Sequence, residues 1–170
     1  LIDHIPYKIN TLCFRLNPQI DNTWEKFGMS EDKILKAYEL SHDKASKFGI
    51  HMMDNSCVLS VDKWENSIRS IMKTVDKVNV DFINLGGGIG IPYTPDEKEI
   101  DLRKLVLSIK KYVGSDCNLY MENGRYITGP AGYLVSKCEV IKKNKDKIFY
   151  GLDSSMTNLM RPGMYGAYHH

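Results

Sequence analysis

The sequence predicts an α/β fold with a parallel sheet, and three observations support this prediction. Short apolar segments typical of strands alternate with segments typical of helices between Thr11 and Glu122, which favours right-handed βαβ units. Polar and glycine-rich residues follow the strands, and they would gather at the carboxyl edge of the sheet, where such folds bind ligands. From Gly132 onward the pattern contains strands with no helix between them, which predicts an antiparallel β module.

Local patterns define the first elements. Residues 11–16 are predicted to form a strand that stops at Asn17-Pro18, since proline cannot continue a central ladder. Ser30 is then predicted to cap a helix with acidic residues in its first turn. The apolar positions at broadly helical spacing in this segment are Ile34, Leu35, Tyr38, Ala45 and Phe48. A short apolar segment, 48–53, follows this helix.

The clearest amphipathic helix begins after Ser60 and covers 61–78, with apolar residues spaced by threes and fours. Residues 80–85 are the next predicted strand, 102–113 another helix and 118–122 another strand. The antiparallel module comprises strands in 133–140 and 148–152. We place the boundary between the two parts near 127–130, which divides the chain into domains 1–128 and 129–170.

Composition argues against nucleic-acid and membrane partners. The 23 basic and 21 acidic residues are scattered and give a net charge of +2, so no basic patch is visible. No segment approaches the roughly 20 apolar residues of a membrane span. The four cysteines show neither a C-x-x-C pair nor a metal-type spacing. We expect reduced thiols in a cytoplasmic protein, with a disulfide as the alternative.

The triplet Gly86-Gly87-Gly88 directly follows an apolar strand and is the most informative segment. Three glycines leave the backbone N–H groups unshielded and form a concavity that suits an anion such as phosphate. The alternative is a tight surface turn without a ligand. The glycines do not give G-x-G-x-x-G and no G-K-[ST] follows, which disfavours a nicotinamide enzyme.

Two further segments carry groups suited to chemistry. Glu122 to Arg125 combines a carboxylate at a strand end with a guanidinium whose fork suits phosphate or carboxylate, a local salt bridge being the alternative. Residues 153–169 are dense in glycine, proline, arginine and tyrosine. We predict a functional loop there, and a solvated terminus is the alternative.

Three segments, taken in order, resemble signatures of the diaminopimelate decarboxylases. They are 86–93 (Gly-Gly-Gly-Ile-Gly-Ile-Pro-Tyr), 122–125 (Glu-Asn-Gly-Arg) and 161–169 (Arg-Pro-Gly-Met-Tyr-Gly-Ala-Tyr-His), with 26–28 and 49–51 also in place. The resemblance implies a fold-type III decarboxylase: the second half of an alanine-racemase-like (β/α)8 barrel over 1–128, then the start of a β domain over 129–170. It implies pyridoxal 5'-phosphate as cofactor, decarboxylation of meso-diaminopimelate to L-lysine in lysine biosynthesis, and a homodimer.

The resemblance also implies roles for individual residues. The glycine triplet would bind the cofactor phosphate, and Glu122 would pair with the pyridine nitrogen. Arg125 would lie between the phosphate and a substrate carboxylate, and Arg161 and Tyr165 would hold the distal end of the amino acid. The other implied cofactor contacts are Asn123, Gly124, Met53 and Ser56. Arg15 is a weaker match, to an arginine of the ornithine decarboxylases.

The sequence departs from the family pattern in several places. Asn123 replaces the usual proline, and Met53 replaces the histidine that stacks on the cofactor ring. Methionine can pack on a ring face but cannot donate or accept a proton as histidine does. The family's Schiff-base lysine would lie upstream of Leu1 and its cysteine motif beyond His170. We therefore expect no catalytic residue of either kind here, no turnover by these 170 residues alone, and a fragment or an assembly with other polypeptide.

Two other readings stay open. The first is a non-catalytic relative that binds pyridoxal phosphate without chemistry, which Met53 favours. The second is a decarboxylase of another amino acid, such as ornithine or arginine.

Overall fold

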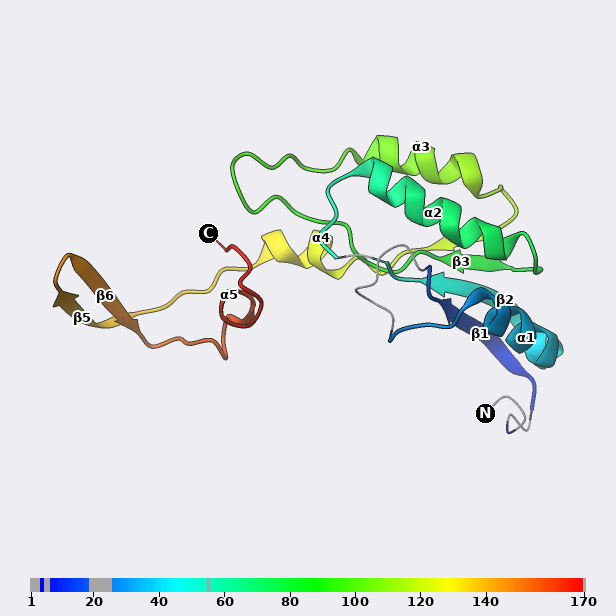
Figure 1. Cartoon of the computed structure of the whole chain (residues 1–170), viewed down its shortest axis with the longest axis horizontal. Coiled ribbons are helices and arrows are strands. Elements are labelled where there is room, and N and C mark those ends of the chain that lie inside the picture. Colours follow the sequence, from blue (N-terminus) through cyan, green and yellow to red (C-terminus); the bar gives the residue numbers. More distant parts are fainter. Residues whose placement is uncertain (1–3, 5–6, 19–25, 55, 170) are drawn as a thin grey trace.

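Four parallel strands form the sheet, in the sequential order β1-β2-β3-β4. The computed structural model describes residue 4 and residues 7–18, 26–54 and 56–169. The strands are β1 (Ile9–Leu16), β2 (Ala45–Met52), β3 (Phe82–Asn84) and β4 (Asn118–Tyr120). They are connected by helices α1 (Glu31–Ser41), α2 (Val61–Val75) and α3 (Leu102–Tyr112), and the short helix η3 (His42–Lys44) follows α1 (Figure 1).

The three connecting helices share one core with one face of the sheet. Ile34 of α1, Ile68 of α2 and Leu105 of α3 are buried together with Ile50 and Ile83 of the strands. A sequential strand order covered by helices on one face is the arrangement of a (β/α) barrel, whereas a doubly wound sheet is covered on both faces. The structure therefore supports the prediction that residues 1–128 contain part of a barrel.

Capping and amphipathic spacing explain where α2 and α3 form. The Ser60 side chain accepts a hydrogen bond from the Lys63 N–H at 3.4 Å, as the sequence predicted, and Trp64, Ile68 and Ile71 are buried. The Asp101 carboxylate similarly caps α3. None of the helices in the described ranges is long and apolar enough to cross a membrane.

The helix predicted after Ser30 is shorter than its apolar spacing indicated. Ala45 and Phe48 were assigned to this helix, but both lie in β2, where they pair with Ile9 and Leu12 of β1. Both side chains are buried against the same core as α1, so the apolar spacing continued across the helix end. The prediction was wrong because pairing with a distant strand decided the conformation.

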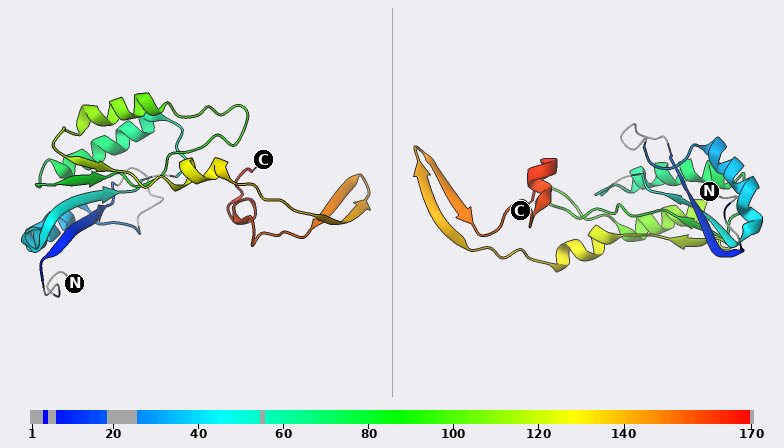
Figure 2. Two further views of the ribbon diagram at one scale, coloured as in Figure 1. Left: turned by 180° about the vertical axis from the view of Figure 1, so that it is seen from behind. Right: turned by 90° about the horizontal axis from the view of Figure 1, so that it is seen from below.

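The remainder of the chain forms an antiparallel hairpin flanked by short helices. β5 (Cys138–Asn144) pairs with β6 (Lys147–Leu152), which confirms the predicted antiparallel module. The hairpin stands away from the parallel sheet in Figures 1 and 2. The predicted boundary falls where α4 (Gly124–Thr128) passes into η4 (Gly129–Ala131), and the division into two domains stays a prediction.

Residues 153–169, predicted to be a loop, contain the short helix α5 (Met160–Tyr165). Pro162 lies in its first turn, where no N–H is needed for a helical hydrogen bond. Gly166 ends the helix with φ at +57°, in the left-handed region that glycine tolerates.

Candidate functional site

The carboxyl edge of the sheet gathers the glycine-rich and polar segments, as the sequence predicted. We call residues 86–90 the glycine loop. The Glu122 N–H donates to the Gly86 carbonyl at 2.8 Å, and the Val58 N–H donates to the Gly88 carbonyl at 2.8 Å. The glycine loop is therefore tied both to the segment after β4 and to the segment after β2.

Two of the glycines occupy positions where a side chain does not fit. Gly86 has φ at +65°, and a Cβ there would lie 2.5 Å from the Met52 carbonyl oxygen. A Cβ on Gly87 would lie 2.5 Å from the Glu122 carbonyl oxygen. The glycines are therefore required for the loop to pass close to the ends of the neighbouring strands.

The glycine loop presents two free N–H groups. The N–H of Gly86 donates to Asn84 Oδ1 at 2.8 Å, and the N–H of Ile89 donates to Asn123 Oδ1 at 3.4 Å. The N–H groups of Gly87 and Gly88 have no acceptor within the described part of the chain. Adjacent unpaired N–H groups form an anion-binding concavity, so this loop fits a phosphate.

The Glu122 carboxylate lies beside this loop, on the sheet face opposite the helices. Its Oε1 accepts a hydrogen bond from Asn84 Nδ2 at 2.8 Å, and its Oε2 lies 4.0 Å from His51 Nε2. Burial lowers the pKa of His51, the Glu122 carboxylate raises it and Arg15 lowers it, and the net direction is downward. The Glu122 side chain is 58% exposed, so the carboxylate is oriented by Asn84 yet accessible to a ligand.

β1 contributes Cys13 and Arg15 to the same face. Burial, followed by the Glu122 carboxylate, raises the pKa of the Cys13 thiol to about 11, so the thiol is protonated at neutral pH. Arg15 Nη2 donates to the Met53 carbonyl at 3.2 Å. This arginine thus fixes the end of β2 beside the glycine loop.

Arg125 and Arg161, predicted to bind the substrate, meet at the ring of Tyr93. The Cζ atoms of Arg125 and Arg161 lie 5.9 and 4.7 Å from the ring centroid, and the His169 ring centroid lies 5.8 Å away. Neither guanidinium has a carboxylate partner among the described residues. Arg161 Nε is buried without a hydrogen-bond partner. The pair of guanidiniums therefore fits an external anion.

The other predicted site residues differ in how they are placed. Met53 lies against the glycine loop, since a Cβ on Gly86 would be 3.0 Å from Met53 Cβ. Tyr165 is 71% exposed and makes no ring contact in the described regions, and Ser56 is also exposed. Asn55 lies outside the described residues. The structure thus places Met53 beside the glycine loop but gives no contact that supports the predicted substrate-binding role of Tyr165.

Sequence reasoning missed two residues of this site. Asn84 orients Glu122, and its place at the end of β3, two residues before Gly86, was a signal that could have found it. Tyr93 joins two arginines that are 36 residues apart in the chain. No local pattern reveals a contact of this kind.

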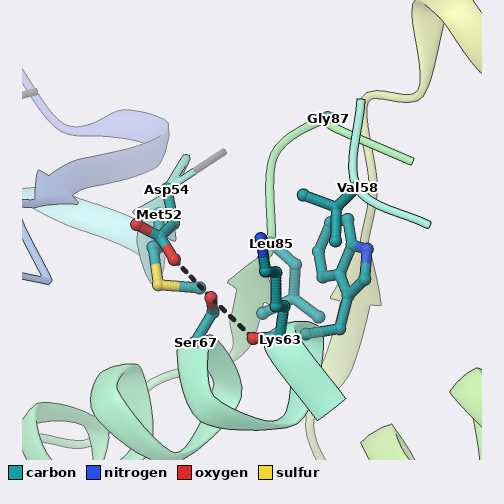
Figure 3. A pocket seen from close by; sticks show the side chains of 8 residues that line it. Met52, Asp54, Val58, Lys63, Ser67, Leu85 and Gly87 are labelled. Carbon is teal, nitrogen blue, oxygen red and sulfur yellow. Dashed lines mark hydrogen bonds between the residues drawn. The ribbon is translucent and has the colours of Figure 1, made fainter. Parts of the chain in front are cut away.

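A small cavity lies beneath the glycine loop (Figure 3). Its volume is about 10 Å³, and its lining includes Met52, Leu85 and Gly87. The Ser67 hydroxyl donates to the buried Asp54 carboxylate and thereby ties α2 to the end of β2. The cavity has room for about one water molecule, so a phosphate would bind on the open side of the loop.

Comparison with known proteins assigns the chain to a family. A family model described as the C-terminal sheet domain of pyridoxal-dependent decarboxylases matches residues 13–170. The chain belongs to the pyridoxal-dependent decarboxylase family. The matched range includes almost all of the parallel sheet as well as the hairpin. The family resemblance inferred from the three signatures is confirmed.

Curated relatives match nearly the whole of this chain. Protein TabA of Pseudomonas amygdali pv. tabaci is 35% identical over 94% of this chain and 43% of its own length. The diaminopimelate decarboxylase of Methanothermobacter thermautotrophicus is 30% identical, also over 94% of this chain and 43% of its own length. The chain thus spans less than half the length of these relatives.

Solved structures show the same arrangement. Diaminopimelate decarboxylase from Methanocaldococcus jannaschii, in complex with L-lysine, matches with a TM-score of 0.82 and 28% identity, over 96% of this chain and 43% of that protein. The Helicobacter pylori enzyme, also with L-lysine, has a TM-score of 0.87 at 24% identity, over 99% of this chain and 46% of that protein, which shows a shared fold.

Proposed function

We propose that this chain forms the phosphate-binding and carboxylate-binding part of a pyridoxal-phosphate-dependent amino-acid decarboxylase, with meso-diaminopimelate as the substrate. The observation that carries the proposal is the pair of free N–H groups at Gly87 and Gly88 beside the Glu122 carboxylate. Family membership and relatives named diaminopimelate decarboxylase support it.

Different residues at the carboxyl edge of the sheet would bind different parts of the cofactor. The Gly87 and Gly88 N–H groups would bind its phosphate, and the Glu122 carboxylate would keep a proton on its pyridine nitrogen. The bound cofactor supplies an electron sink for the charge that remains when the substrate carboxylate leaves as carbon dioxide. Asn84 holds Glu122 Oε1 and thereby fixes the carboxylate without neutralising it. Met53 would pack against the ring.

The two arginines at Tyr93 would select the substrate. Arg125 would contact the phosphate side of a ligand, because it lies in α4, directly after the segment that is hydrogen-bonded to the glycine loop. Arg161 brings a buried, unpaired Nε from α5. A substrate with carboxylates at both ends would satisfy both guanidiniums, which favours a dicarboxylic diamino acid over ornithine.

The test uses the natural polypeptide that carries these residues. We expect it to bind pyridoxal phosphate in an absorbance titration and to release carbon dioxide from meso-diaminopimelate, while residues 1–170 alone release none. Arg161→Ala should raise the Michaelis constant at least tenfold and change the cofactor dissociation constant less than threefold. Arg103→Ala, at an exposed position of α3, is the matched control.

Two results would overturn the proposal. One is a natural polypeptide with no affinity for pyridoxal phosphate. The other is equal weakening of substrate and cofactor by Arg161→Ala, because that variant would then disturb the whole site and not one end of the substrate.

Met53 favours a second candidate function, a non-catalytic protein that binds pyridoxal phosphate. The thioether can pack on a ring but cannot accept or donate a proton as an imidazole does. Borohydride reduction of the natural polypeptide with bound cofactor separates the two candidates. A stable phosphopyridoxyl-lysine would support the enzyme, whereas reversible binding without trapping would support the second candidate.

A further inference from the structure

The ring of Tyr93 contacts the guanidiniums of both Arg125 and Arg161. Arg161 lies in α5 beyond the hairpin, and Arg125 lies in α4 before it. Tyr93 follows the glycine loop and comes from neither helix. The ring therefore joins three segments that the chain brings together from distant positions.

The backbone of Tyr93 is itself held in place. Its N–H donates to Glu97 Oε2 at 2.6 Å, and the N–H of Thr94 donates to the same oxygen at 3.1 Å. The Glu97 N–H in turn donates to the Thr94 carbonyl at 3.1 Å. This closed turn fixes where the Tyr93 side chain leaves the backbone, so the ring is a defined support for the two cations.

Two guanidiniums near one ring repel each other unless something compensates. Neither is paired with a carboxylate in the part of the chain that the structure describes. The electron-rich face of an aromatic ring attracts cations that approach within about 6 Å of its centroid, and both Cζ atoms do so. An aromatic ring can therefore hold the two cations together while leaving their N–H donors free.

We propose that Tyr93 is a positioning residue that orients Arg125 and Arg161 for the carboxylates of the substrate before the substrate binds. The proposal rests on the proposed function, since it assumes that these arginines bind substrate. The ring is the active feature, because the Tyr93 hydroxyl makes no hydrogen bond with the described residues. The amino acid would then meet two arginines already arranged to receive it.

The experiment compares Tyr93→Phe, which keeps the ring, with Tyr93→Leu, which removes it, in the natural polypeptide. Tyr93→Phe should keep the Michaelis constant for meso-diaminopimelate within twofold, and Tyr93→Leu should raise it on the order of tenfold. The turnover number and the cofactor dissociation constant should change less than threefold. Tyr133→Leu, at a position 94% exposed, is the matched control.

Binding of pimelate, a dicarboxylate without amino groups, gives a readout that needs neither cofactor nor turnover. In calorimetric titrations of the cofactor-free polypeptide, Tyr93→Leu should weaken pimelate on the order of tenfold and Tyr93→Phe should not. Tyr93→Met removes the ring with an unbranched side chain and serves the same purpose if the leucine variant does not fold.

A double-mutant cycle tests whether Tyr93 acts through Arg161. The loss in Tyr93→Leu/Arg161→Met should be smaller than the product of the two single losses, because Tyr93 has less to orient once Arg161 is gone. Losses that multiply fully, or a Tyr93→Leu variant that keeps the wild-type Michaelis constant, would overturn the proposal. A wild-type polypeptide that neither binds pimelate nor decarboxylates would instead overturn the proposed function, and the role of Tyr93 with it.

Discussion

Substitution of Gly87 by alanine is the sharpest test of the phosphate site. The new Cβ would lie 2.5 Å from the Glu122 carbonyl oxygen, whereas ordinary van der Waals contact begins at 3.4 Å. The glycine loop and the end of β4 must therefore separate by about 0.9 Å. A displacement of this size lengthens a hydrogen bond of about 2.9 Å beyond its useful range, so at least one N–H contact to the phosphate is lost.

The loss can be given a magnitude. A hydrogen bond to a charged group contributes about 1.5–3 kcal/mol, so the dissociation constant for pyridoxal phosphate should rise roughly 10- to 150-fold. Absorbance titration of the natural polypeptide measures this constant, and thermal melting checks that the variant folds.

Gly114→Ala is the control, because a Cβ at Gly114 meets nothing within 4 Å. A folded Gly87→Ala variant that binds the cofactor as tightly as Gly114→Ala would refute the assignment of this loop to phosphate.

Three further predictions concern the scaffold of the site. Gly49→Ala puts a Cβ 2.3 Å from the ring of buried Phe82 and should lower the free energy of unfolding by about 1–3 kcal/mol in urea; an unchanged midpoint would contradict it. Hydroxyl and guanidinium donors lower the pKa of Glu65 from 4.5 to about 2. The ionised Glu65 carboxylate therefore stabilises the folded state above pH 4.5, and this stabilisation is lost as the pH falls toward 2. Glu65→Gln should flatten the pH dependence of the free energy of unfolding, measured in urea between pH 6 and 2.5. An identical pH profile would count against the hydrogen bonds that Tyr112, Arg69 and Ser108 donate to Glu65. Asn123→Ala leaves the buried Ile89 N–H unpaired and should lower the free energy of unfolding by about 1 kcal/mol, with Gly114→Ala as the control. An unchanged free energy of unfolding would show that the 3.4 Å hydrogen bond contributes nothing to stability.

The fold and one part of the site were accessible from sequence because their signals are local. The cap at Ser60 and the spacing of Trp64, Ile68 and Ile71 encode α2 within a few turns of chain. Only Leu85 separates the glycine triplet from the end of β3, so its place at the carboxyl edge followed from strand direction alone. By contrast, Ala45 was misplaced in a helix because burial against the core looks alike in a helix and in a strand when only apolar spacing is read.

The sequence by itself determined the alternation of strands and helices, the family signatures, and which residue types stand at the strand ends. Only the tertiary structure decided that Gly87 and Gly88 keep their N–H groups free, that Asn84 orients Glu122, and that Arg161 reaches Tyr93. Each of these depends on contacts between segments far apart in the chain. Such contacts are set by how the buried core positions the strands, and no window of neighbouring residues contains that information.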